Sequence, residues 1–269
     1  MSYQGVDTVA RFSADKAKQL RSMGMSFVGR YLGPASWGKT ITRSEADALL
    51  AAGLSILLCY ETSAERMRGG AAAGEIDGLN ARNYAQDLGL PAGTTIYFAC
   101  DYNAPTGDLI LCESYIRAAQ AALGGIYEAG VYGPEKVVSF LSERGACDKF
   151  WQCVAWSNQF LPVANVRQYA WQGDARAKAM AAACGIAAVD LDAGEDLRGL
   201  WRPKETATHW YDDTVLWAEK EGVISPTPTI ADARPEDPAT RAEVMQMIRN
   251  YNRRFEDADT KTASGLLAD

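Results

Sequence analysis

Apolar residues along the chain occur in two arrangements, short continuous runs and longer segments with helical spacing. Continuous short runs are typical of strands buried on both faces, and apolar residues three or four apart are typical of helices. Helix signals lie between the runs: Thr42 and Glu45 form a capping box, and Gly53 ends the segment that they open. Eight strand-like runs result, at 5–10, 26–32, 54–61, 94–100, 129–133, 149–156, 166–171 and 187–194.

Helix-like segments separate most of these strands. Repeated strand–helix units imply parallel strands, and eight of them over about 195 residues predict a (β/α)8 barrel of the TIM type at the small end of its size range. The link SNQFLP between the sixth and seventh strands is too short for a helix, so we expect an irregular barrel there. A doubly wound open sheet is the alternative, although no GxGxxG turn follows the first strand.

The chain changes character near residue 200. We expect a barrel over 1–200, a linker over 201–207, a small α-helical module over 208–257 and a flexible tail over 258–269. The module contains one helical segment stopped by Gly222 and a second opened by a capping box of Thr240 and Glu243. About fifty residues make a small core, so we expect this module to pack on the barrel or to form a homo-oligomer with copies of itself.

Charge and hydropathy exclude some partners. The net charge is -7, which argues against nucleic acid, because binding phosphates needs a basic face. No apolar run approaches the length of a membrane span. The N-terminal stretch MSYQGVDTVARFS lacks a charged segment followed by an apolar one, so we expect synthesis in the cytoplasm without a signal peptide.

Histidine and cysteine restrict the chemistry further. The single histidine is His209, so the barrel has no Ser-His-Asp, Cys-His or histidine-based metal site. None of the six cysteines forms a CxxC pair. We interpret Cys59, Cys100 and Cys153, which lie inside strand-like runs, as small buried hydrophobes. We therefore expect no metal and no cofactor, and carboxylates as the catalytic groups of any enzyme.

Acidic residues lie on or at the end of several strands. The run TTIYFAC is followed by Asp101, Glu61 ends the third strand, and Asp7 lies on the first. The eighth strand carries Asp190 and Asp192. Because the working face of such a barrel lies at the carboxyl ends of its strands, we expect Asp7, Glu61, Asp101 and one of the strand-eight pair to converge on one pocket.

Clustered carboxylates can divide acid and base roles. Neighbouring carboxyls push each other's pKa values apart, so that one stays protonated while another is ionised, and glycoside hydrolysis uses such a pair. Further candidates for holding a sugar lie at the same strand ends: Arg30, Tyr31, Tyr132, Trp156, Gln168 and Tyr169. Each has a structural alternative, as a helix cap, an ion-pair partner or a residue that covers the core.

Several motifs also occur together and in a specific order. They are GVDTVARFSADKAKQL, FVGRYLGP, ITRSEADALLAAGLSILLCYE, LGLPAGTTIYFACDYN, GVYG, WQCVAWS, RQYAW and VDLD. Over about residues 3–195 they resemble a glycoside-hydrolase-like barrel family, DUF1906, which is similar in turn to the family-25 muramidases that cut peptidoglycan. The resemblance implies a peptidoglycan hydrolase of the endolysin type, acting at the cell wall after lysis or after signal-independent export.

The fourth-strand motif departs from that pattern. The muramidases carry D-x-E, whereas this chain has Asp101-Tyr102-Asn103. If Asp101 matches the muramidase Asp, Asn103 replaces the catalytic Glu; if it matches the Glu, Ala99 replaces the upstream acid. Glu61 is the candidate to substitute for the missing group.

The resemblance assigns roles with alternatives. Asp101 and Glu61 would share the acid and the nucleophile or base roles, Asp7 and Asp192 would orient the sugar or tune pKa values, and Asn103 would contact the substrate. The main alternative is a non-catalytic protein that binds cell-wall glycan or assembles at the cell surface. An enzyme acting on another polymer is the third interpretation.

Residues 208–256 resemble a single S-layer homology motif. HWYDDTVLWAEKEGVI and TRAEVMQMI match its two helices, while the central portion is reduced to SPTPTIADARPED. Such motifs bind cell-wall polysaccharide and usually work three at a time, so one copy implies weak binding or assembly through oligomers. A plain helical appendage is the alternative.

Overall fold

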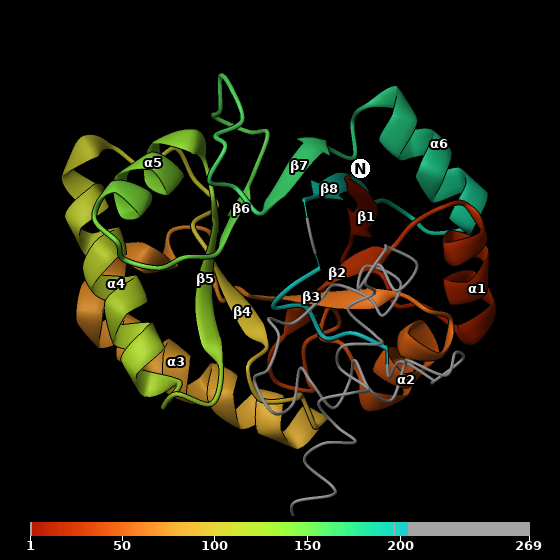
Figure 1. The fold of residues 1–269 in the computed structure, drawn as a ribbon, viewed down its shortest axis with the longest axis horizontal. Coiled ribbons are helices and arrows are strands. Elements are labelled where there is room, and N and C mark those ends of the chain that lie inside the picture. Colours follow the sequence, from red (N-terminus) through yellow and green to blue (C-terminus); the bar gives the residue numbers. More distant parts are fainter. Residues whose placement is uncertain (1, 196, 204–269) are drawn as a thin grey trace, which may run out of the picture. The chain divides into compact units, whose positions relative to one another are not determined.

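The computed structural model describes residues 2–195 and 197–203. This part of the chain contains eight strands, closed into a barrel in the order β1 to β8, and six α-helices (Figure 1). The strands are β1 (Tyr3–Asp7), β2 (Phe27–Leu32), β3 (Ser55–Tyr60), β4 (Thr95–Ala99), β5 (Glu128–Gly133), β6 (Phe150–Gln152), β7 (Val166–Ala170) and β8 (Asp190–Gly194). The helices are α1 (Ala14–Ser22), α2 (Arg43–Ala51), α3 (Gly70–Leu88), α4 (Leu109–Ala122), α5 (Glu135–Glu143) and α6 (Ala175–Cys184). The expected α/β barrel of the TIM type is confirmed.

The expected C-terminal features concern residues after 203. The module over 208–257, its S-layer-like motif and the tail fall outside the described residues, and the domain boundaries stay predictions. None of the helices in 2–195 and 197–203 combines the length and apolarity needed to cross a membrane.

Alternate side chains of the strands fill the barrel, because successive residues of a strand point to opposite faces. The inward set is Phe27, Leu57, Cys59, Tyr97, Ala99, Trp151 and Val166, joined by Leu197 and Leu200. The last two belong to the segment after β8, which lies against the amino ends of β3 and β4. There Thr95 N donates to Gly199 O, and Trp201 pairs with Ile56. This segment therefore covers the barrel at the amino ends of β3 and β4, and we look for a functional site at the opposite end.

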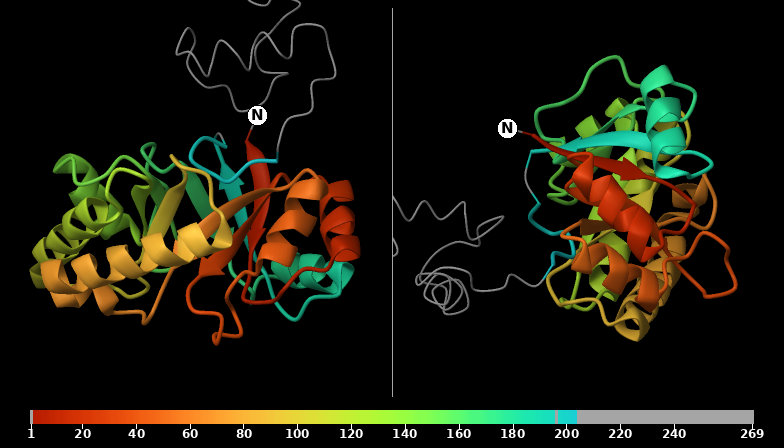
Figure 2. Two further views of the ribbon diagram at one scale, coloured as in Figure 1. Left: turned by 90° about the horizontal axis from the view of Figure 1, so that it is seen from below. Right: turned by 90° about the vertical axis from the view of Figure 1, so that its right-hand side faces the viewer.

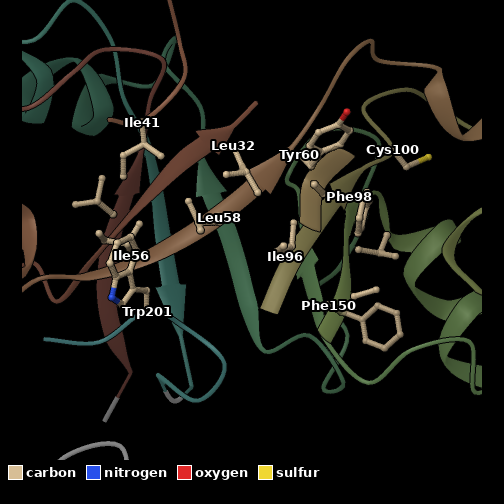
Figure 3. Packing of buried hydrophobic residues seen from close by; sticks show 14 of the residues in the cluster. Leu32, Ile41, Ile56, Leu58, Tyr60, Ile96, Phe98, Cys100, Phe150 and Trp201 are labelled. Carbon is tan, nitrogen blue, oxygen red and sulfur yellow. The ribbon is translucent and has the colours of Figure 1, made fainter. Parts of the chain in front are cut away.

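The outward strand faces pack against helices. Figure 3 shows Leu32, Leu58, Ile96 and Phe98 on the adjacent strands β2, β3 and β4, within one buried cluster. In Figures 1 and 2 the helices form two groups, α3 to α5 beside β4 and β5, and α1, α2 and α6 on the other side. Burial on both faces is the reason that the strands read as continuous apolar runs.

One strand differs from the expected parallel arrangement. β8 runs antiparallel to both β1 and β7, pairing Asp7 with Asp190 and Tyr3 with Gly194. The chain returns after α6 to the carboxyl end of β1, where Thr8 Oγ1 donates to Ala188 O at 2.6 Å. The start of β8, rather than its end, therefore lies at the open end of the barrel. The expected irregularity is also present, since no helix joins β6 to β7.

Candidate active site

A cavity of about 600 Å³ opens at the carboxyl ends of β1 to β7 and the amino end of β8. It is lined by Asp7, Tyr31, Cys59, Glu61, Ala99, Asp101, Tyr132, Trp151, Val154, Ala155, Gln168, Trp171, Gln172 and Asp190. Most of these side chains occupy the last inward position of a strand or the first inward position beyond it. The structure thus brings four carboxylates together at one opening, within an aromatic wall.

A single amide organises two of these carboxylates. Gln168 Nε2 donates to Asp7 Oδ2 at 2.9 Å and to Asp190 Oδ2 at 3.0 Å. The Tyr132 hydroxyl donates to Gln168 Oε1 at 3.1 Å, which fixes which end of the amide faces the acids. Two carboxyl groups are therefore held side by side by one neutral amide donor.

Burial raises the pKa values of the carboxyls at the bottom of the cavity, which is called the floor below. The pKa of Asp7 is raised to about 7, first by burial and then by the nearby charge of Asp190. Asp192 lies deeper, and burial followed by Asp7 raises its pKa well above the usual value. Trp151 Nε1 donates to Asp192 Oδ1 at 2.8 Å, whereas Asp192 Oδ2 is buried without a donor. The Asp7 and Asp192 carboxyls interact, and that interaction favours a proton on Asp192.

The opposite side of the cavity carries a charged pair. Lys39 Nζ lies 2.6 Å from Glu61 Oε2 and 4.2 Å from the centre of the Tyr31 ring. Burial, followed by the charge of Glu61, raises the pKa of Asp101, while Lys39 opposes the shift. The site therefore contains an ion-paired carboxylate, Glu61, next to a carboxyl whose surroundings favour its protonated form. That division is what acid–base chemistry by two carboxyls requires.

Five expected site residues lie away from this cavity. Arg30 is buried between β2 and α2, where its Nε lies 2.8 Å from Glu45 Oε1. The Tyr169 hydroxyl donates to Gln4 Oε1 on the outer face of the barrel. Asn103 and Trp156 line a separate groove, and Asp192 lies beneath the cavity because β8 is antiparallel.

Four further residues contribute to the site without having been predicted from the sequence: Lys39, Trp151, Trp171 and Gln172. The position of Trp151 could have been predicted, because parallel pairing of β5 with β6 places it beside the inward-facing Tyr132. The centres of the two rings lie 4.6 Å apart. Trp171 and Gln172 directly follow β7. Lys39 lies in a loop, and no pattern in the sequence marks it.

The cavity contains one cysteine side chain. Cys59 lines the cavity, but burial raises the pKa of its thiol well above the ordinary value, which disfavours the nucleophilic thiolate. Within the described ranges, no group of three or more histidine, cysteine or acidic side chains is arranged to hold a metal ion.

Replacing Asp7 with asparagine should alter the pH dependence of stability. With a folded-state pKa of about 7 and an unfolded value of about 3.9, the folded protein holds more protons between these limits. The contribution of Asp7 to the free energy of unfolding therefore falls as pH rises through this window, by up to about 1.4 kcal/mol per pH unit. The asparagine amide cannot titrate but can still accept from Gln168, so Asp7→Asn should lose this slope and be the more stable form at about pH 8. Urea unfolding across the window measures this, and parallel curves for the two proteins would contradict it.

Solved structures share this fold. The Mycobacterium tuberculosis protein Rv2525c, crystallised with L-tartrate, matches with a TM-score of 0.61 and 23% identity, covering 74% of this chain and 98% of that chain. The modular autolysin LytC from Streptococcus pneumoniae matches with a TM-score of 0.51 and 14% identity, covering 71% and 46% respectively. At these identities the likeness concerns the fold alone. Rv2525c is a Tat-secreted protein, and on that finding the expectation of a protein made and acting without an export signal is withdrawn.

Two uncharacterized Bacillus subtilis proteins are similar in sequence. FadG is 31% identical over 153 residues, covering 52% of this chain and 26% of its own length. YbfG is 34% identical over 159 residues, covering 52% and 21%. The chain thus spans about a quarter of the length of these relatives. The model of the Rv2525c-like, glycoside hydrolase-like domain matches residues 18–193, most of the barrel and more than half of the chain. The match does not carry the expected family name DUF1906. It shows that the chain belongs to the Rv2525c-like glycoside hydrolase-like family.

Proposed function

We propose that the barrel is a glycoside hydrolase that cuts the glycan of bacterial peptidoglycan. The observation that carries this is the pairing of Asp101, whose pKa is raised, with the ion-paired Glu61 in one aromatic-lined cavity. The family description, glycoside hydrolase-like, supports the reaction class. LytC, an autolysin whose structure was also determined with a synthetic peptidoglycan ligand, supports the substrate class.

The proposed roles follow from the raised pKa of Asp101 and from the ion pair of Glu61 with Lys39. Asp101 would donate a proton to the glycosidic oxygen, and Glu61 would act as the base or nucleophile on the other side of the bond. Asp7 and Asp190, held by Gln168, would accept hydrogen bonds from sugar hydroxyls at the floor. Asp192 would act indirectly, as a positioning residue that interacts with Asp7.

A second candidate function has its own support. Ala99 lines the cavity at the inward position before Asp101, which supports matching Asp101 with the muramidase Glu and Ala99 with the missing acid. Lys39 also neutralises Glu61 at 2.6 Å. A barrel with one usable acid would bind cell-wall glycan without cutting it.

Purified peptidoglycan separates the two functions. We expect the full chain to release new reducing ends, and to sediment with the walls. Sedimentation without release would establish the binding function instead. Neither release nor sedimentation would overturn both proposals.

A further inference from the structure

A second hollow lies next to the cavity and has no assigned role. This groove, of about 690 Å³, is lined by Asn103, Leu109, Glu135, Lys136, Ser139, Phe140, Glu143, Trp156, Ser157 and Asn158. Its walls come from the loops after β4 and β6, from the start of α4 and from α5. Exposed amides beside aromatic rings are the combination by which proteins hold sugars, as the rings cover apolar C–H faces and the amides bond to hydroxyls.

Trp156 is unusual in both exposure and backbone. Its side chain is large and apolar, yet the residue is 48% exposed. It is also the one non-glycine residue with positive φ, 54°, in the part of the chain that the structure describes. A bulky residue in that region is strained, and such strain is found preferentially at functional sites.

The three residues that follow Trp156 are hydrogen-bonded to α5 and to β6. Glu135 Oε2 accepts from Asn158 N at 2.7 Å, and Glu135 N donates to Ser157 Oγ at 2.9 Å. Gln152, buried on β6, donates to Gln159 O at 2.7 Å. The indole is thus presented to solvent by a fixed backbone, which lowers the entropy lost when a ligand stacks on it.

The groove continues from the cavity along two segments of chain. In the β4–α4 loop, Asp101 lines the cavity and Asn103 lines the groove. After β6, Ala155 lines the cavity and the next residue, Trp156, lines the groove. A polymer with one sugar in the cavity would reach the groove with the sugars that follow.

We propose that this groove is a distal subsite for a polymeric glycan, with Trp156 as its stacking platform. The inference rests on the proposed function for the choice of ligand, and it adds that affinity depends on chain length. A long glycan strand would bind through both hollows, whereas a disaccharide would occupy the cavity alone.

The test measures binding without turnover. In full-length protein carrying Asp101→Asn, calorimetry would compare peptidoglycan strands freed of stem peptides with their disaccharide unit. Trp156→Ala and Trp156→Gly should each weaken the long strand by about tenfold and leave the disaccharide unchanged. Glycine suits positive φ, so Trp156→Gly should unfold at a higher temperature than Trp156→Ala while binding equally weakly. Ile76→Ala, an exposed apolar residue on α3 outside both hollows, is the matched control.

The outcomes separate the two proposals. Unchanged long-strand affinity in both Trp156 variants, or an equal loss for the strand and the disaccharide, would overturn the subsite alone. If the long-strand affinity is lost with Trp156, and the wild type with Asp101 intact also releases no reducing ends, the subsite stands and catalysis is overturned. No binding of either ligand before Trp156 is changed would overturn the subsite and the glycan assignment together.

Discussion

Asp101→Asn should reduce reducing-end release from peptidoglycan by about 10²- to 10⁴-fold, the range that one general acid contributes. The amide keeps the shape of the side chain but has no acidic proton for the leaving oxygen. Burial and the charge of Glu61 raise the pKa of Asp101, so the wild type keeps a protonated fraction at a pH where an ordinary Asp would be ionised. Initial rates on purified walls, with wall binding measured in parallel, would separate lost chemistry from lost affinity.

Two further variants make this result interpretable. Asp47→Asn removes a carboxylate from an exposed ion pair with Arg43 on α2, and it should leave release unchanged. Glu61→Gln should lower the rate by a similar factor as Asp101→Asn if the two carboxyls share the reaction. Release that survives both cavity substitutions would show that these residues are not the acid and the base.

The fold could be predicted because burial on both faces leaves a direct mark in the sequence. Every residue of β3 and β4 is buried, so the runs 54–61 and 94–100 are mainly apolar. The direction of β8 could not be predicted in this way, because a strand reads alike in both directions. The return of the chain to Thr8 involves a tertiary contact, the hydrogen bond from Thr8 Oγ1 to Ala188 O, which has no local pattern in the sequence.

Site residues at the ends of strands could be predicted from the sequence, whereas those in the loops that follow could not. Asp7, Glu61 and Asp101 reach one cavity because strand alternation and the barrel's open end fix their positions. Asn103 and Trp156 lie only one or two residues beyond such positions, yet loop geometry turns them into the groove. Whether a residue lines the cavity is therefore predicted better by its inward-facing position on a strand than by its place in a sequence motif.

Arg30 shows the same limit for a charged residue. Its place near a strand end suggested the pocket, but its side chain points outward on β2 and meets Glu45 of α2. The capping box predicted at Thr42 forms in part, as Glu45 N donates to Thr42 Oγ1 at 3.3 Å. The Glu45 carboxylate instead accepts from Arg30 and from Phe12 N at 3.1 Å. One carboxylate thus connects β2, α2 and the loop after β1.

Arg30→Met should lower the free energy of unfolding by about 3–5 kcal/mol, the largest loss of stability that we expect from a single substitution here. Arg30 is 1% exposed and the Glu45 side chain 2%, so the variant would leave a buried carboxylate with Phe12 N as its remaining donor from outside α2. The double variant Arg30→Met with Glu45→Leu removes both charges and should recover much of the loss, since a buried pair adds little over apolar packing. Asp47→Asn, which breaks an exposed pair, should cost less than about 0.5 kcal/mol. Urea midpoints of the four proteins test this prediction. A double variant as unstable as Arg30→Met would contradict it. The loss would then come from missing packing and backbone contacts, including that of Arg30 with Thr8 O, and not from an unpaired charge.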